Sequence, residues 1–257
     1  MREFIKKIIT YAASVNNKQS DLLKEIVFNN LNSNAINQDL NIDTDKLFNL
    51  LIDLKGTSLV EGLNITNSLL EILSLDGDVC EFGVAQGKTS KLIAHFIKDS
   101  NKKLFLFDSF KGLPKPSEKD ELKDDIFNLG DMKKYEGKMS HEEYKVINEL
   151  KSINFNKDRL IINKGFFSEE SKINMELPKS VSFAFLDFDF YQPTLDGLNY
   201  LNNVLNVGGI IMVDDYDFFS TGAKTSVDEW FKINSKSYIK KVIKTKCTSF
   251  VTLEKIN

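Results

Sequence analysis

Two short apolar segments, each followed directly by closely spaced aspartates, constrain the fold of this chain more than any other feature. They are residues 181–186, which lead into Asp187 and Asp189, and residues 209–213, which lead into Asp214 and Asp215. Apolar runs of this length, bounded by turn residues, predict strands that are buried on both faces. The sequence therefore favours an α/β fold with a parallel sheet.

The four aspartates are expected to meet at one edge of that sheet. Open α/β sheets bind ligands outside the carboxyl ends of their strands, and these aspartates come directly after such ends. Like charges at such short range repel unless protons or a cation intervene. A set of oxygen ligands favours a hard cation, Mg²⁺ first, with Mn²⁺ and Ca²⁺ as alternatives. A single solvated Asp after a buried strand is common, but two strands that both end in paired Asp favour a cation site.

Further strands and helices alternate along the chain. Short apolar runs at 78–82, 104–107 and 160–162 predict strands, and segments with helical periodicity lie between them. Two β-like runs at 238–243 and 248–253 predict an antiparallel hairpin near the C-terminus. This order predicts a doubly wound, mostly parallel sheet with right-handed crossovers, a C-terminal hairpin and N-terminal helices.

We expect a single domain over residues 1–257. Residues 1–75 are expected to form a helical N-terminal extension, with Ser20 and Asp43 as helix caps. The polar stretch within residues 111–150 is too long for an ordinary connection between a strand and a helix. We therefore interpret it as a functional insertion or lid.

Composition and charge exclude several classes of protein. A hydrophobic fraction of 42% with 20 Phe supplies a sizeable core, and a net charge of −3 gives no general basic surface for nucleic acid. The N-terminal residues lack a continuous apolar run and no segment is long enough to span a bilayer, so we expect a cytoplasmic protein without membrane insertion. Cys80 and Cys247 are expected to be buried free thiols, with a disulfide as the alternative. Abundant Lys, Asn and Ile are typical of an AT-rich bacterial genome.

A glycine-containing turn follows the strand predicted at 78–82. Its pattern is Glu81-x-Gly83-x-x-x-Gly87, and a predicted helix begins directly after it. Glycines allow a tight turn and a close approach of a ligand to the backbone, and a helix N-terminus offers free N–H groups. The pattern differs from the G-x-G-x-x-G of dinucleotide-binding proteins, and it retains only the final G-K-T of a phosphate-binding loop.

Asp108, at the end of the strand predicted at 104–107, strengthens the interpretation of this turn as a cofactor site. An acid at that position can accept hydrogen bonds from ribose hydroxyls, and a turn cap through Ser109 is its alternative role. A glycine turn without a full phosphate cradle, followed by a ribose-binding acid, suits a nucleoside cofactor that has no pyrophosphate. S-adenosylmethionine has that form, and its sulfonium charge favours an acidic pocket that includes Glu81.

Several segments match one enzyme family in their order and spacing. They are residues 77–84, 108–114, 164–167, 186–191 and 208–216. The Asp-Ser-Phe-x-Gly-Leu-Pro run that begins at Asp108 is the most distinctive of them. In these segments the chain resembles the macrocin O-methyltransferase family, metal-dependent enzymes that methylate sugar hydroxyls of macrolides.

The resemblance implies a class I methyltransferase (Rossmann-like) fold and methyl transfer from S-adenosylmethionine to a hydroxyl oxygen, with Mg²⁺ as the metal. We expect Asp189, Asp214 and Asp215 to be the metal ligands, with Asp189 also the catalytic base. The expected cofactor-binding residues are Thr57, Glu81, Gly83, Val84, Gly87, Asp108, Ser109, Gly165, Phe166 and Asp187. The resemblance also implies a homo-oligomer.

We expect the acceptor to be a small-molecule sugar or nucleotide sugar, or a surface-glycan sugar of polysaccharide biosynthesis. The alternatives are an O-methyltransferase of a catechol-like or macrolide acceptor, a metal-dependent hydrolase or phosphotransferase, and a non-catalytic binding module. Near the site, His141 is an alternative base, while His95 is expected to be structural. Tyr191 and Tyr216 follow the metal carboxylates and could line the acceptor pocket.

Overall fold

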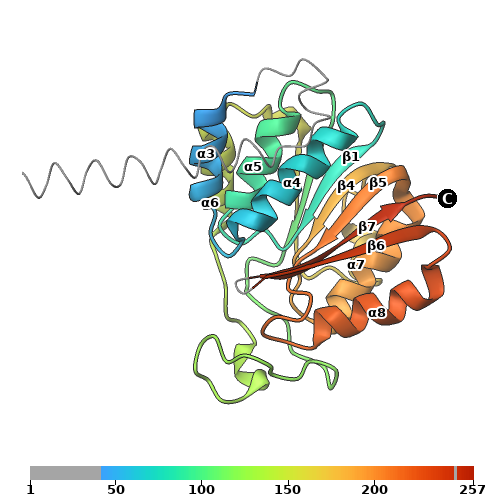
Figure 1. The fold of residues 1–257 in the computed structure, drawn as a ribbon. Coiled ribbons are helices and arrows are strands. Elements are labelled where there is room, and N and C mark those ends of the chain that lie inside the picture. The colour runs from blue at the N-terminus through green and yellow to red at the C-terminus, as the bar shows by residue number, and fades with distance from the viewer. Residues whose placement is uncertain (1–41, 246–247) are drawn as a thin grey trace, which may run out of the picture.

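The computed structural model describes residues 42–245 and 248–257 (Figure 1). A seven-stranded sheet runs through its centre, in the order β3-β2-β1-β4-β5-β7-β6. The strands are β1 (Asp78–Phe82), β2 (Leu104–Asp108), β3 (Leu160–Lys164), β4 (Val181–Leu186), β5 (Leu205–Val213), β6 (Tyr238–Lys244) and β7 (Ser249–Lys255). β1 to β5 pair in parallel, and β7 pairs antiparallel with both β5 and β6. The predicted sheet and its C-terminal hairpin are confirmed.

The strand order reverses at β1. β2 and β3 follow on one side of β1, and β4 and β5 follow on the other. Such a switch leaves a crevice outside the carboxyl ends of the central strands, where α/β proteins bind ligands. The backbone N–H of Asp187, just after β4, donates to the carbonyl of Phe82 at 2.8 Å, so the ends of β4 and β1 meet there.

Helices pack on both faces of the sheet. They are α3 (Thr44–Ile52), α4 (Leu59–Ile72), α5 (Lys88–Ile97), α6 (Glu143–Ser152), α7 (Tyr191–Val204) and α8 (Gly222–Asn234), with short 3₁₀ turns η1 (Met132–Tyr135), η2 (Lys157–Arg159) and η3 (Ser171–Asn174). The predicted cap of α3 is confirmed, because the Asp43 side chain accepts a hydrogen bond from the N–H of Lys46. The helix expected after Ser20 lies outside the described residues, as does Cys247. Within residues 42–245 and 248–257, none of the helices has the length and apolar character needed to cross a bilayer.

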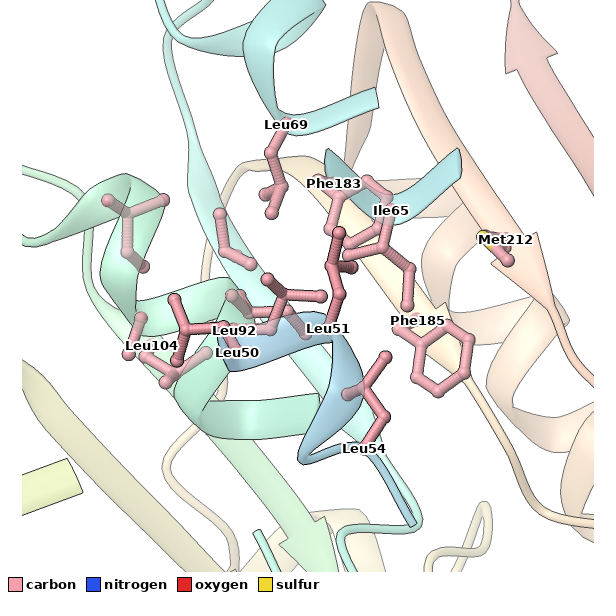
Figure 2. Close-up of a cluster of buried hydrophobic side chains, with 14 of the residues drawn as sticks. Leu50, Leu51, Leu54, Ile65, Leu69, Leu92, Leu104, Phe183, Phe185 and Met212 are labelled. Carbon is pink, nitrogen blue, oxygen red and sulfur yellow. The ribbon is translucent and has the colours of Figure 1, made fainter. Parts of the chain in front are cut away.

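Two hydrophobic cores hold the sheet between these helices. α3 to α6 cover one face, and α7 and α8 cover the other (Figure 1). Side chains alternate along each strand, so Val79 belongs to the first core and Cys80, a buried free thiol, to the second. Figure 2 shows the first core, in which Ile65 of α4 packs with Phe183 and Phe185 of β4. The ends of the strands, and the site built on them, are thereby held in fixed register.

The long connection between β2 and α6 lies beyond the carboxyl edge of the sheet, in the lower part of Figure 1. It shares a small third core with the loops after β4 and β5, made of Leu113, Met132, Tyr135, Phe190 and Phe219. Leu122 also pairs with Ser220 in an isolated β-bridge. The stretch predicted to be an insertion is therefore packed against the two loops that carry the aspartates.

Candidate active site

The carboxyl ends of the parallel strands open into a pocket of about 540 Å³. This volume lies in the range of small-molecule and cofactor sites. Among the residues expected from the sequence, those that line it are Gly83, Asp108, Ser109, Gly165, Phe166, Asp187, Asp189, Asp214 and Asp215. One pocket thus joins the predicted cofactor turn to the predicted metal carboxylates.

The glycine turn packs directly against the segment that follows β4. Gly83 has a φ of +82°, and a Cβ added there would lie 1.8 Å from the carbonyl oxygen of Asp187. Only glycine fits such a close approach in the left-handed region. The turn therefore packs its backbone directly against the segment that carries Asp187, and Gly83 also lines the pocket.

Asp108 joins the glycine turn to the end of β2. Its Oδ2 accepts hydrogen bonds from the N–H groups of Val84 at 2.7 Å and Ala85 at 3.0 Å. Its Oδ1 accepts from the N–H of Phe110 at 2.6 Å, which is a turn cap like the alternative considered for this residue. Asp108 also lines the pocket, and its Oδ1, which accepts one hydrogen bond, keeps a second lone pair for a ligand, whereas the turn uses both lone pairs of Oδ2.

Four of the expected cofactor residues lie behind the pocket wall. Thr57, Glu81, Val84 and Gly87 are absent from its lining. The hydroxyl of Thr57 lies 2.9 Å from that of Thr89, and Gly87, with a φ of +77°, is the N-cap residue of α5. Their cofactor-binding role, expected from the sequence, therefore stays a prediction.

Glu81 is the least exposed of the acids near the turn. Its Oε2 accepts a hydrogen bond from the hydroxyl of Ser90, while its Oε1 is buried with no hydrogen-bond partner in the structure. Burial raises the pKa of Glu81 to about 8, against the lowering effect of the Ser90 hydrogen bond. At neutral pH this carboxyl is therefore mostly protonated.

Three carboxylates converge in the pocket. Asp187, Asp189 and Asp215 each offer an oxygen, and these oxygens all lie within 4.8 Å of one another. Asp189 and Asp215 have φ values of 63° and 53°, in the left-handed region that few residues other than glycine adopt. The two turns after β4 and β5 thus direct their acids toward Asp187.

The surrounding protein makes the charged forms of these acids costly. Desolvation raises the pKa of Asp189 to about 7, and the neighbouring charge of Asp187 adds to the effect. Desolvation and neighbouring acids also raise the pKa of Asp187 and of Asp215 well above the ordinary range. Three carboxyl groups whose ionised forms repel one another supply the oxygen donor set that a hard divalent cation prefers.

Asp214 lines the same pocket but does not belong to this convergent group. Its Oδ1 accepts a hydrogen bond from the N–H of Asp215 at 2.8 Å, and its carboxyl also interacts with Glu61. The converging set therefore contains Asp187 where the sequence analysis expected Asp214.

Glu61 is an acid of the site that the sequence analysis missed. It belongs to the first turn of α4, is 2% exposed and completes a capping box with Ser58. The Ser58-x-x-Glu61 spacing is a readable signal for that cap. Nothing local in the sequence indicates that the same carboxyl reaches the aspartates after β5.

Much of the remaining lining of the pocket comes from the connection between β2 and α6. It contributes Pro114, Lys115, Ile126, Met139 and His141, and the loop after β5 contributes Phe218 and Phe219. Desolvation, followed by the charge of Lys145, lowers the pKa of His141. Tyr191 and Tyr216, which were expected here, are not in the lining: their hydroxyls donate to Glu229 and Asp228. His95, which was expected to be structural, is absent from the lining, and its ring lies edge-to-face with that of Phe96 in α5.

Comparisons with known proteins agree with this arrangement. The sequence profile of the family described as Macrocin-O-methyltransferase (TylF) matches residues 56–246. A comparison with curated protein sequences finds no match.

Solved methyltransferase structures share the fold at low sequence identity. The O-methyltransferase NovP has a TM-score of 0.65 and 19% identity, with 93% of this chain and 100% of that chain covered. CalS11, a calicheamicin methyltransferase, has a TM-score of 0.59 and 16% identity, with 93% and 91% covered. TomG, an O-methyltransferase of Streptomyces achromogenes in complex with SAM, has a TM-score of 0.51 and 13% identity, with 95% and 96% covered.

The structural neighbours and the family match point to one enzyme class. The neighbours confirm the class I methyltransferase fold expected from the sequence. The family profile spans the glycine turn, the strands of the parallel sheet and all four aspartates. This chain therefore belongs to the macrocin-O-methyltransferase family and is an O-methyltransferase.

Proposed function

We propose that this enzyme uses S-adenosylmethionine and Mg²⁺ to methylate a hydroxyl of a nucleotide-linked or surface-glycan sugar. The observation that carries the proposal is the convergence of Asp187, Asp189 and Asp215 in the same pocket as the glycine turn. A methyl donor and an activated hydroxyl need to meet at such a junction. The fold neighbour CalS11, described as a TDP-rhamnose 3'-O-methyltransferase, supports a sugar nucleotide as the acceptor.

The part of the pocket around the glycine turn has the features that S-adenosylmethionine needs. Gly83 lines the pocket with backbone alone, the Oδ1 of Asp108 keeps a lone pair for a ribose hydroxyl, and Phe166 offers a 44% exposed aromatic ring for the adenine. Gly165 also lines the pocket, and its N–H donates to the carbonyl of Asp108 at 2.9 Å. TomG, which shares the fold, is a SAM complex.

A second part of the pocket contains the oxygen donors that would hold Mg²⁺: Asp187, Asp189 and Asp215. A divalent cation there lowers the pKa of a nearby hydroxyl and neutralises the clustered acids. Asp189 is our proposed base, because it lines the pocket and a carboxylate within reach of the hydroxyl can take its proton. Family membership favours this chemistry over the hydrolase, phosphotransferase and binding-module alternatives.

The part of the pocket proposed to bind the acceptor combines apolar surface with a few polar groups, which suits a sugar. The exposed ring of Phe218 can pack on the face of a pyranose, while Gln192 and Lys115 offer hydrogen-bond donors. His141 lines the same side and stays the alternative base.

The test is a methyltransferase assay with S-adenosylmethionine and a panel of nucleotide sugars that includes TDP-rhamnose. We expect turnover that EDTA abolishes and Mg²⁺ restores. Asp189→Ala should lose activity by at least about a hundredfold, while the affinity for S-adenosylhomocysteine stays near that of the unaltered enzyme. Turnover of catechols alone, or full activity in the presence of EDTA, would contradict the proposal.

A further inference from the structure

The connection between β2 and α6 is hydrogen-bonded to both loops that carry the convergent acids. The N–H of Thr221 donates to the carbonyl of Glu121 at 3.0 Å, and the N–H of Lys123 donates to the carbonyl of Phe219 at 2.8 Å. These bonds attach the connection to the loop after β5. In the part of the chain that the structure describes, the connection is thus a fixed wall of the pocket.

Asp120 makes the matching attachment to the loop after β4. It is 5% exposed, and its Oδ1 accepts a hydrogen bond of 2.7 Å from the N–H of Tyr191, the first residue of α7. Its Oδ2 accepts from the N–H and the hydroxyl of Ser117 at 2.7 Å and 2.6 Å. A buried carboxylate with all of these donors is held in one orientation.

The packing around Asp120 leaves little room for another arrangement. A Cβ added to Gly222, the first residue of α8, would lie 1.8 Å from the Oδ1 of Asp120 and 2.6 Å from the nitrogen of Tyr191. The starts of α7 and α8 therefore close around this carboxylate. Ser220 adds a link, since its hydroxyl donates to the carbonyl of Asp189 at 2.9 Å and accepts from the N–H of Gly222 at 3.0 Å.

The turn that Asp120 secures is the one that carries Asp189. Asp189 has a φ of 63°, a conformation that its surroundings must stabilise because it is unfavourable for residues other than glycine. Phe190, between Asp189 and Tyr191, is 1% exposed in the small third core. The Asp120 carboxylate and this ring fix the turn from its C-terminal side.

We propose that Asp120 is a positioning residue, which holds the turn after β4 so that the Asp189 carboxylate stays close to those of Asp187 and Asp215. Its catalytic consequence rests on the proposed function, but the contact itself does not. Asp120 touches no reacting atom in this scheme and acts through Tyr191 and Phe190. A displacement of about 1 Å in a catalytic group can cost about a hundredfold in rate.

The test compares Asp120→Ala, Asp120→Asn and the control Asp125→Ala. Asn retains an oxygen that can accept from Tyr191. Asp125 lies in the same connection and accepts from Leu129, Gly130 and Tyr135, all within that connection, so its loss removes as many hydrogen bonds without touching α7. All three are to be measured with TDP-rhamnose as acceptor, with S-adenosylhomocysteine binding, with Mn²⁺ titration and with hydrogen–deuterium exchange of residues 187–195.

We expect Asp120→Ala to lower kcat about ten- to a hundredfold, with little change in the affinity for S-adenosylhomocysteine. It should also weaken Mn²⁺ binding and speed amide exchange at the start of α7, while Asp120→Asn, which keeps the acceptor for Tyr191 but loses the one for Ser117, recovers part of each loss and Asp125→Ala changes none. Equal effects in Asp120→Ala and Asp125→Ala, or no recovery in Asp120→Asn, would overturn the proposal. If the unaltered enzyme methylates no acceptor, the proposed function fails. Mn²⁺ binding and amide exchange still test the positioning role of Asp120 in that case.

Discussion

The carboxylate of Asp108 accepts a 2.7 Å hydrogen bond from the backbone N–H of Val84, which ties the end of β2 to the glycine turn after β1. The two segments that would hold the nucleoside half of the cofactor are thus one structural unit. A ligand that contacts either of them depends on the same carboxylate. This coupling leads to the first of four predictions.

Asp108→Ala should weaken the binding of S-adenosylhomocysteine by about tenfold or more, because it removes charge-assisted hydrogen bonds to the turn and a ribose acceptor together. Isothermal titration calorimetry measures this directly. Asp99→Ala, at a side chain that is 89% exposed, is the matched control and should bind normally. Unchanged affinity in Asp108→Ala would remove Asp108 from the cofactor site.

Asp187→Asn should weaken Mn²⁺ binding more than Asp214→Asn does. The oxygen of Asp187 converges with those of Asp189 and Asp215, whereas Asp214 accepts from the N–H of Asp215 and interacts with Glu61. Titrations of both variants monitored by electron paramagnetic resonance give the comparison. The reverse order would support the ligand set expected from the sequence, which contains Asp214.

The metal-free protein should lose thermal stability as the pH rises from about 4 to about 7. The pKa of Asp189 is raised from an ordinary 3.8 to about 7, so the folded state binds its proton more tightly than the unfolded state. The stabilisation from this group is complete below about pH 4 and is lost as the pH rises through the folded value. Asp187 and Asp215 shift in the same direction.

Calorimetry with EDTA measures that loss, and saturating Mg²⁺ should restore much of it at the alkaline end. Asp189→Asn should have a shallower dependence on pH in EDTA than the unaltered protein, because one of the titrating acids is gone. A melting temperature that rises with pH in EDTA would contradict the raised pKa values.

Glu81→Gln should stabilise the folded protein, by an amount that grows as the pH rises from about 4.5 to about 8 and is complete above that. The pKa of Glu81 is raised from 4.5 to about 8 by burial, and each pKa unit corresponds to about 1.4 kcal/mol of preference for the protonated form. Glutamine keeps an acceptor for the hydroxyl of Ser90 and cannot ionise. Chemical denaturation at about pH 6 and about pH 9 measures the difference, and exposed Glu118→Gln is the control, which should show none.

Local pattern was sufficient for most of the secondary structure. The runs 181–186 and 209–213 are buried strands, and the C-terminal runs form the antiparallel hairpin, because side-chain periodicity reports burial on each face. The Asp43 cap of α3 was also predictable from the sequence, because the hydrogen bond that defines it spans only a few residues. Gly83 was readable as a turn, although its contact with Asp187 was not.

The sequence by itself determined that Asp187, Asp189, Asp214 and Asp215 gather at one edge of a parallel sheet, because each pair directly follows a buried strand. Tertiary structure alone decided which of them converge, since that depends on the left-handed turns at Asp189 and Asp215 and on Glu61 reaching Asp214 from α4. The same holds for Asp120, whose partner Tyr191 is distant in the sequence. Spacing predicts neighbours along one strand end, but contacts between loops depend on how every layer of the fold packs.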